Sequence, residues 1–78
     1  MRTSERENRM PSTTKQIGQR VKEERKSQGL TQTELANLSG VGLNFVSQLE
    51  QGKPSVQFDK VLMVLETLGL AVDLKYLK

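Results

Sequence analysis

The chain has 78 residues with no cysteine and no histidine, and its twelve Lys and Arg residues against nine Asp and Glu residues give a net charge of +3. A chain of this length forms one domain with one modest core, which leaves no room for a catalytic cleft, and we expect no enzyme. The composition excludes disulfides, thiolate or imidazole catalysis and a zinc site with soft ligands, so we expect neither a cofactor nor a metal. No apolar run approaches the ~20 residues that span a bilayer and the amino terminus lacks a signal peptide, so we expect a cytoplasmic protein.

The first thirteen residues are polar and charged and show no periodicity, which predicts a disordered arm over 1–13. Residues 14–28 follow as an amphipathic helix that buries Ile17 and Val21, with Gly29 as its C-terminal stop. This helix gathers five basic side chains, namely Lys15, Arg20, Lys22, Arg25 and Lys26. Two neighbouring glutamates dilute the cluster, which by itself is as typical of a solvated helix face as of a phosphate-binding surface.

A second helix is predicted over residues 32–39, and its start carries a capping signal. The hydroxyl of Thr31 can cap the helix while Glu34, three residues further on, returns a hydrogen bond to the cap amide. We expect Leu35 and Leu38 to form the apolar face of this helix.

Only three residues, Gly40 to Gly42, separate this helix from the next one, with Gly40 expected in the left-handed conformation that ends a helix. The next helix runs over 43–51, is closed by Gly52, and turns Val46 and Leu49 inward. Four residues then remain on its outward face: Leu43, Asn44, Ser47 and Gln48. Ordinary helical bundles also contain such helix pairs, but the short turn favours a helix-turn-helix, which presents its second helix to the major groove of DNA.

A fourth helix is predicted after Pro54, which blocks any continuation of the third. Ser55 is expected to cap this helix, which extends to Gly69. Its apolar residues recur at intervals of three and four: Phe58, Val61, Leu62, Leu65 and Leu68. The four helices are expected to share one core in a DNA-binding domain over 14–69.

The last nine residues, 70–78, change to a period of two that is rich in strand-forming residues. The alternating apolar positions are Leu70, Val72, Leu74 and Tyr76. An isolated strand leaves its backbone groups open, so we expect the tails of two copies to pair antiparallel across a two-fold axis. The alternative is a short fifth helix over DLKYLK. Either way we expect a homodimer, because this apolar patch is hard to keep soluble alone.

The order T-Q-x-E-L-A, then S-G-V, then a helix ending in L-E-x-G-K resembles the XRE and lambda-repressor-like family of DNA-binding domains, over about residues 17–70. The resemblance implies an all-α, four-helix domain, to which the C-terminal strand would add the dimer contact. It further implies that Gln32 anchors a phosphate and braces the recognition helix, and that Lys53 belongs to a second phosphate clamp. Thr31 and Arg20 complete the expected phosphate contacts.

The same resemblance implies an internal ion pair between Arg25 and Glu50, which holds the first helix against the recognition helix. The sequence departs from the family at Gly42, a helix cap position where relatives usually carry Ser or Thr. A glycine cap is tolerated, although it lacks the side-chain hydrogen bond.

The outward side chains of the third helix suit the recognition of base edges. Asn44 and Gln48 can each bond adenine in a bidentate fashion, Leu43 can contact a thymine methyl group, and Ser47 is a less selective donor. Two-fold symmetry places two such helices in successive major grooves about 34 Å apart, so the expected target is double-stranded DNA with an inverted-repeat operator.

The sequence therefore predicts a sequence-specific, homodimeric transcriptional repressor that works at the nucleoid. The small domain and its L-x-V-x-L tail are similar to HipB-like antitoxins, which neutralise a HipA-like serine/threonine kinase toxin and repress their own operon. A free-standing or phage XRE-type repressor is the alternative. A third possibility is an interaction adaptor that keeps the fold without binding DNA, with Leu43 and Phe45 forming an apolar docking surface.

Overall fold

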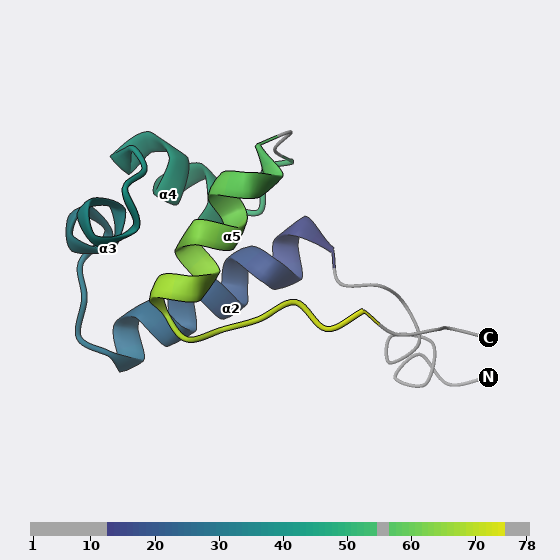
Figure 1. The fold of residues 1–78 in the computed structure, drawn as a ribbon, viewed down its shortest axis with the longest axis horizontal. Helices are drawn as coiled ribbons and strands as arrows, with labels where there is room; N and C mark the ends of the chain where they lie inside the picture. Colours follow the sequence, from purple (N-terminus) through teal and green to yellow (C-terminus); the bar gives the residue numbers. More distant parts are fainter. Residues whose placement is uncertain (1–12, 55–56, 75–78) are drawn as a thin grey trace.

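The computed structural model describes residues 13–54 and 57–74, and this part of the chain contains four helices (Figure 1). They are α2 (Thr14–Ser27), α3 (Gln32–Ser39), α4 (Leu43–Glu50) and α5 (Phe58–Thr67). The predicted four-helix fold and its helix-turn-helix are confirmed, with helix ends close to those predicted. The predictions for residues 1–12 of the arm, for Ser55 as a cap and for Tyr76 lie outside the described residues, whereas Thr13, the last residue of the predicted arm, is the N-cap of α2.

Capping boxes begin the first two of these helices. The hydroxyl of Thr31 accepts a hydrogen bond from the Glu34 amide at 3.0 Å, and the Glu34 carboxylate accepts one from the Thr31 amide at 2.8 Å. Thr13 and Gln16 form the same arrangement at the start of α2. Gly40 adopts φ +75° after α3, as predicted, because the chain must reverse within the three-residue turn to α4.

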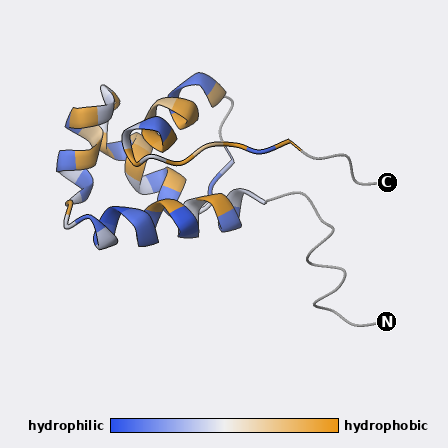
Figure 2. Cartoon of the chain, turned by 60° about the horizontal axis from the view of Figure 1, so that its bottom comes forward, coloured by the Kyte–Doolittle hydropathy of each residue, from blue (hydrophilic) through white to orange (hydrophobic). Residues whose placement is uncertain are grey.

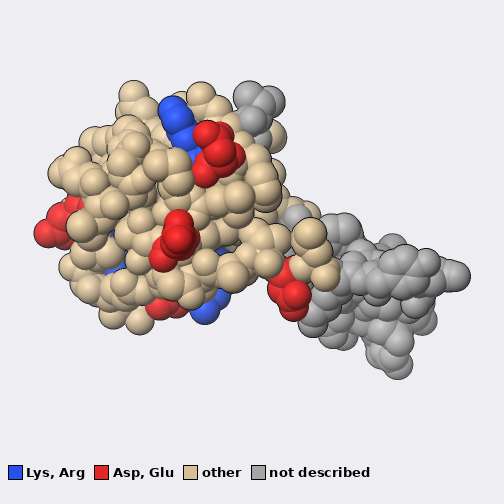
Figure 3. Space-filling model, viewed as in Figure 1, with Lys and Arg blue, Asp and Glu red and all other residues tan. Residues whose placement is uncertain are grey.

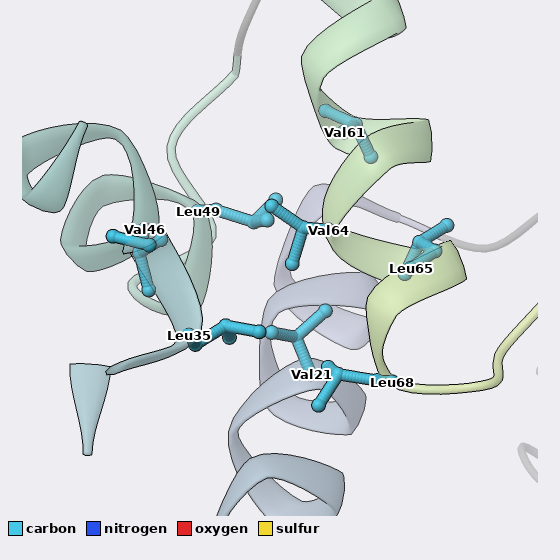
Figure 4. Packing of buried hydrophobic residues seen from close by; sticks show 9 residues of the cluster. Val21, Leu35, Val46, Leu49, Val61, Val64, Leu65 and Leu68 are labelled. Carbon is cyan, nitrogen blue, oxygen red and sulfur yellow. The ribbon is translucent and has the colours of Figure 1, made fainter. Parts of the chain in front are cut away.

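The core is a cluster of nine buried apolar side chains that come from all four helices. In Figure 4, Leu49 of α4 and Val64 of α5 point toward each other, and Leu35 of α3 points toward Val21 of α2. Figure 2 shows that α2 has apolar residues on one face and hydrophilic residues on its outer face. The cluster consists of Val21, Leu35, Ala36, Val46, Leu49, Val61, Val64, Leu65 and Leu68.

Three residues predicted to lie in the core are exposed instead. Leu38 is 65% exposed, because α3 turns Leu35, Ala36 and Ser39 toward α4 and α5. Along α5 and its C-terminal cap residue the predicted Val61, Leu65 and Leu68 are buried as expected, and the fourth buried position is Val64 rather than Phe58 or Leu62. Phe58, which is 56% exposed, and Leu62 therefore lie on a flank of α5.

The first turns of α2 lie directly on the end of α4. Gly18 is buried there, and a Cβ at this position would collide with the carbonyl oxygen of Leu49. Gly52, with φ +83°, closes the contact from the other side, since a Cβ there would lie 2.8 Å from the Cα of Lys15. Two glycines thus allow α2 and the end of α4 to pack backbone against backbone, which fixes the direction of α4.

The chain after α5 runs back toward the N-terminal end of α2 (Figure 1). Residues 70–74, the described part of the tail, form neither the predicted strand nor the alternative helix in the single chain. Leu70 packs against the core, whereas Val72 is 44% exposed and Leu74 is 89% exposed. The apolar tail predicted from the period of two is therefore available at the surface, and its pairing with a second copy stays a prediction.

Candidate nucleic-acid interface

The outward face of α4 carries the four residues that the sequence predicted there. Leu43, Asn44 and Gln48 are exposed and Ser47 is half-buried, while Val46 and Leu49 anchor the opposite face in the core. Because the inward face is fixed by packing, the outward side chains are presented on a rigid helix.

The polar groups on this face differ in their hydrogen bonding. Within residues 13–54 and 57–74, the side-chain amides of Asn44 and Gln48 have no hydrogen-bond partner. The hydroxyl of Ser47, in contrast, accepts a hydrogen bond of 3.1 Å from Nε2 of Gln51, one turn further along. Two amides, each with donor and acceptor groups to offer, thus lie four residues apart on one helix face.

A buried ion pair joins α2 to the last residue of α4. Nε of Arg25 lies 2.6 Å from Oε2 of Glu50, and its Nη2 donates to Oε1 at 3.1 Å, which makes the pair bidentate. Nη1 of Arg25 donates to the carbonyl of Leu30 in the loop before α3 at 2.7 Å. This is the pair that the family resemblance implied.

Gln32 adds α3 to the same network, since its Nε2 donates to Oε1 of Glu50 at 3.0 Å. The carboxylate of Glu50 is therefore bonded from α2 and from α3, and both contacts act on the C-terminal end of α4. A fully bonded buried pair contributes more to a defined geometry than to stability, because desolvation offsets much of its attraction. The network positions α4 against the other two helices.

The surface cation cluster is smaller than the sequence suggested. Arg25 is buried and committed to Glu50, so it cannot contribute to a basic surface. Arg20 is exposed but lies 2.9 Å from Glu24. Hydrogen bonds from Gln28 and from Arg20 hold the pKa of the Glu24 carboxyl below its ordinary value, since they favour the charged form. Four lysines of this part of the chain stay exposed, namely Lys15, Lys22, Lys26 and Lys53.

Charge is distributed unevenly between the two parts of the domain. Residues 13–54 hold six Lys and Arg residues and four Asp and Glu residues, a net charge of +2, whereas residues 57–74 hold one Lys and three Asp or Glu residues, a net charge of −2. Figure 3, viewed onto α5 and the tail, shows acidic side chains spread over this face. The phosphate backbone of DNA would therefore be attracted to residues 13–54 more than to residues 57–74.

An open hollow of about 460 Å³ lies between α2 and the end of α4. It is lined by the polar and charged residues Lys15, Gln16, Gln19, Arg20, Glu23, Glu50 and Gln51, largely through the apolar stems of their side chains. Gln51 belongs both to this lining and to the outward face of α4, so the hollow continues the line of exposed polar groups on that helix. Within the described ranges, no cluster of residues suited to a metal ion is present, and no helix is long and apolar enough to cross a membrane.

The four-helix arrangement, the tight turn between α3 and α4 and the exposed polar face of α4 define a helix-turn-helix domain of the lambda-repressor-like type. The helix-turn-helix family model matches residues 21–75, and the chain belongs to this family. The family-level resemblance seen in the sequence is thereby confirmed.

Proteins of similar sequence are named as HTH-type transcriptional regulators. The chain is 53% identical over 58 residues to "Uncharacterized HTH-type transcriptional regulator y4mF" of Sinorhizobium fredii, which covers 74% of this chain and 76% of that protein. It is 44% identical over 54 residues to the HTH-type transcriptional regulator SinR of Bacillus subtilis, covering 64% of this chain and 49% of SinR. The match thus spans about half the length of SinR.

A similar solved structure is the crystal structure of the restriction-modification controller protein C.AhdI from Aeromonas hydrophila. The two structures share a TM-score of 0.66 and 33% sequence identity, over 74% of this chain and 84% of that chain. The resemblance extends beyond the helix-turn-helix itself, since it covers most of both chains.

Sequence reasoning missed two residues that shape the interface. Gly18 was not singled out because a lone glycine inside a helical pattern gives no sign of what it packs against. The sequence pattern placed Gln51 only at the end of a helix. Its position four residues after Ser47 nevertheless puts both residues on one helix face, and this spacing could have indicated their contact.

Proposed function

We propose that the protein is a homodimeric, sequence-specific transcriptional repressor that reads an inverted-repeat operator with the outward face of α4. The observation that carries this proposal is the pair of exposed amides, Asn44 and Gln48, which have no partner within the described residues. They stand on a helix whose other face is packed and whose end is tied to α2 and α3 by Glu50. A rigid support of this kind suits side chains that must meet base edges in one orientation.

The proposed contacts follow from the chemistry of each side chain. Asn44 and Gln48 offer bidentate hydrogen bonds to N6 and N7 of adenine, and Leu43 offers an apolar contact to a thymine methyl group. Phosphate contacts are assigned to Lys53 after α4, to Arg20 on α2, and to Thr31 and Gln32 at the start of α3. One N–H of the Gln32 side chain donates to Glu50, so its side-chain carbonyl oxygen and second N–H group remain for other contacts.

The proposed dimer uses the apolar surface that the single chain leaves uncovered. Val72 and Leu74 in the tail and Phe58 and Leu62 on α5 are exposed, and burying them in a second copy would remove apolar area from water. Leu70 and Tyr76 complete the predicted pairing strand. The negative charge of this side supports the same arrangement, because it turns the α5 and tail side away from DNA while α4 faces the groove.

Selection from a randomised duplex library tests the proposal. Purified protein is expected to enrich an inverted repeat whose half-sites lie about one helical turn apart, near 34 Å between centres. Affinity for the enriched site should fall steeply as salt rises, since phosphate contacts release counterions. No enrichment, or binding that ignores salt, would instead favour an interaction adaptor.

A narrower role as an antitoxin is a second candidate, favoured by the exposed apolar tail residues Val72 and Leu74. In this role the protein would neutralise a HipA-like serine/threonine kinase and repress the operon that encodes both. Co-purification with a kinase encoded beside it, together with relief of the toxicity of that kinase, is the expected result. Failure to bind any such kinase would exclude the antitoxin role, and the repressor function would remain.

A further inference from the structure

The side chain of Gln51 forms a contact that lies within the outward face of α4. Its Nε2 donates to Oγ of Ser47 at 3.1 Å, while the backbone N–H of Gln51 bonds the Ser47 carbonyl at 3.1 Å. Gln51 is the C-terminal cap residue of α4 and is itself exposed. The side-chain amide of Gln51 thus contacts Ser47 from the end of the helix, while Asn44 and Gln48 remain exposed.

A serine hydroxyl has one proton to donate and accepts hydrogen bonds through its lone pairs, and it rotates to suit its partners. When Gln51 donates to Oγ, it occupies a lone pair and favours the rotation in which the hydroxyl proton points elsewhere. Among the described residues, no acceptor receives that proton. The hydroxyl of Ser47 is thus prepared to donate to a group outside the chain.

Thr67 is an example, in the same domain, of a hydroxyl that both accepts and donates a hydrogen bond within the protein. Oγ1 of Thr67 accepts a hydrogen bond from Ser39 at 3.0 Å and donates its own proton to the carbonyl of Met63 at 3.0 Å. There both roles of the hydroxyl are filled inside the protein. At Ser47 the described residues fill only the accepting role, and the hydroxyl belongs to the helix face that the proposed function assigns to DNA.

We propose that Gln51 is a specificity-determining positioning residue, which makes Ser47 a donor and so directs it to a base that offers an acceptor in the major groove. Guanine offers N7 and O6, adenine N7 and thymine O4, whereas cytosine offers only the donor N4. Cytosine is therefore disfavoured at the base position that Ser47 contacts. This inference rests on the proposed function, because it requires that α4 reads base edges.

The test begins with the operator obtained by selection and with Ser47→Ala, which identifies the base pair whose preference depends on Ser47. At that pair, duplexes with each of the four bases are compared for every variant by measuring affinity. Gln51→Met keeps the length of the side chain but removes its donor. Its discrimination against cytosine is expected to drop by about two- to ten-fold, the range of one hydrogen bond, with other base pairs unaffected.

Gln51→Glu provides the sharper test because its carboxylate can only accept at neutral pH. The hydroxyl of Ser47 would then donate to the carboxylate and turn a lone pair toward the base. Cytosine, which donates through N4, is expected to become the preferred base at this pair, or at least equal to the others. The added negative charge lowers affinity for all four duplexes alike, so the ratio between bases is the readout.

Two controls separate this role from a structural one. Gln19→Met removes an amide from the same hollow, where it bonds Glu23 rather than a residue of α4, and should leave the base preference unchanged. In a Ser47→Ala background, Gln51→Met should have no further effect on the preference. Uniform weakening at every base pair, or an unchanged preference in Gln51→Met and Gln51→Glu, would overturn the inference. If the wild-type protein shows no base preference at all, it is the proposed function that fails.

Discussion

Gly18 of α2 lies directly against the carbonyl group of Leu49 in α4, with no space for a side chain between them. A Cβ at Gly18 would collide with that carbonyl oxygen and would lie 3.0 Å from both the Glu50 carbonyl oxygen and the Gly52 amide nitrogen. All three are backbone atoms at or just after the end of α4, so none can swing aside as a flexible side chain would. The position of α4 relative to α2 therefore depends on the absence of one carbon atom.

Replacing Gly18 by alanine is expected to destabilise the domain by about 1–3 kcal/mol, because the two helices must separate to admit the methyl group. Helix propensity alone would favour alanine by roughly 1 kcal/mol, so a net loss identifies the packing contact. Urea denaturation measures the difference. The matched control is Gly42→Ser, since a Cβ at Gly42 meets nothing within 4 Å and serine restores a cap worth a few tenths of a kcal/mol over glycine. Equal stability of Gly18→Ala and wild type would contradict the packing argument.

Removing the guanidinium of Arg25 is expected to be the most damaging single change among the polar residues. Arg25→Ala leaves the buried carboxylate of Glu50 with Gln32 as its remaining partner, and breaking a buried pair in this way costs about 3–5 kcal/mol. The matched control is Arg20→Ala, which removes the pair with Glu24 at the surface of α2 and should destabilise the domain far less. Thermal unfolding of both variants gives the comparison, and similar losses would show that the Arg25 pair does not hold the domain together.

Local signals in the sequence predicted most of the fold. Thr31 with Glu34, the glycines after each helix and the spacing of Val46 and Leu49 act over three or four residues, so a sequence displays them directly. The burial of α5 and α3 was predicted less well, because which of several apolar stripes faces inward depends on the neighbouring helices. Phe58, Leu62 and Leu38 are apolar at plausible spacing and are nevertheless exposed.

In the candidate site, too, local features could be predicted from the sequence, whereas contacts between distant residues could not. The exposure of Leu43, Asn44 and Gln48 follows from helical periodicity and could be predicted. The contact between Gln32 and Glu50 joins residues eighteen positions apart, and Arg25 contacts Glu50 across twenty-five positions. Periodicity does not reach that far, and only the family resemblance indicated the Arg25 pair.

The tail provides a prediction about assembly. Val72→Ser combined with Leu74→Ser is expected to convert the proposed dimer into a monomer, because it removes the exposed apolar side chains of the proposed pairing strand. These substitutions are preferable to truncation after Gly69, which would also delete Leu70 from its place against the core. Light scattering across a concentration series measures the mass.

A control for this experiment is Leu38→Ser, which removes an exposed leucine from α3 and should leave the proposed dimer intact. If the doubly substituted tail still yields a dimer, the tail does not form the interface, and the exposed flank of α5 with Phe58 and Leu62 becomes the surface to vary next.

The most direct test of the account measures how Asn44→Ala and Gln48→Ala change the preference for the selected operator over a random duplex of equal length. Each variant should lose about 1–3 kcal/mol of that preference while its affinity for random DNA and its stability stay unchanged, because the lost contacts are to bases. Asn37→Ala, which removes an exposed amide from α3, serves as the control and should behave as wild type. Equal losses on operator and random DNA, or an unchanged preference, would contradict the claim that the outward face of α4 reads the bases.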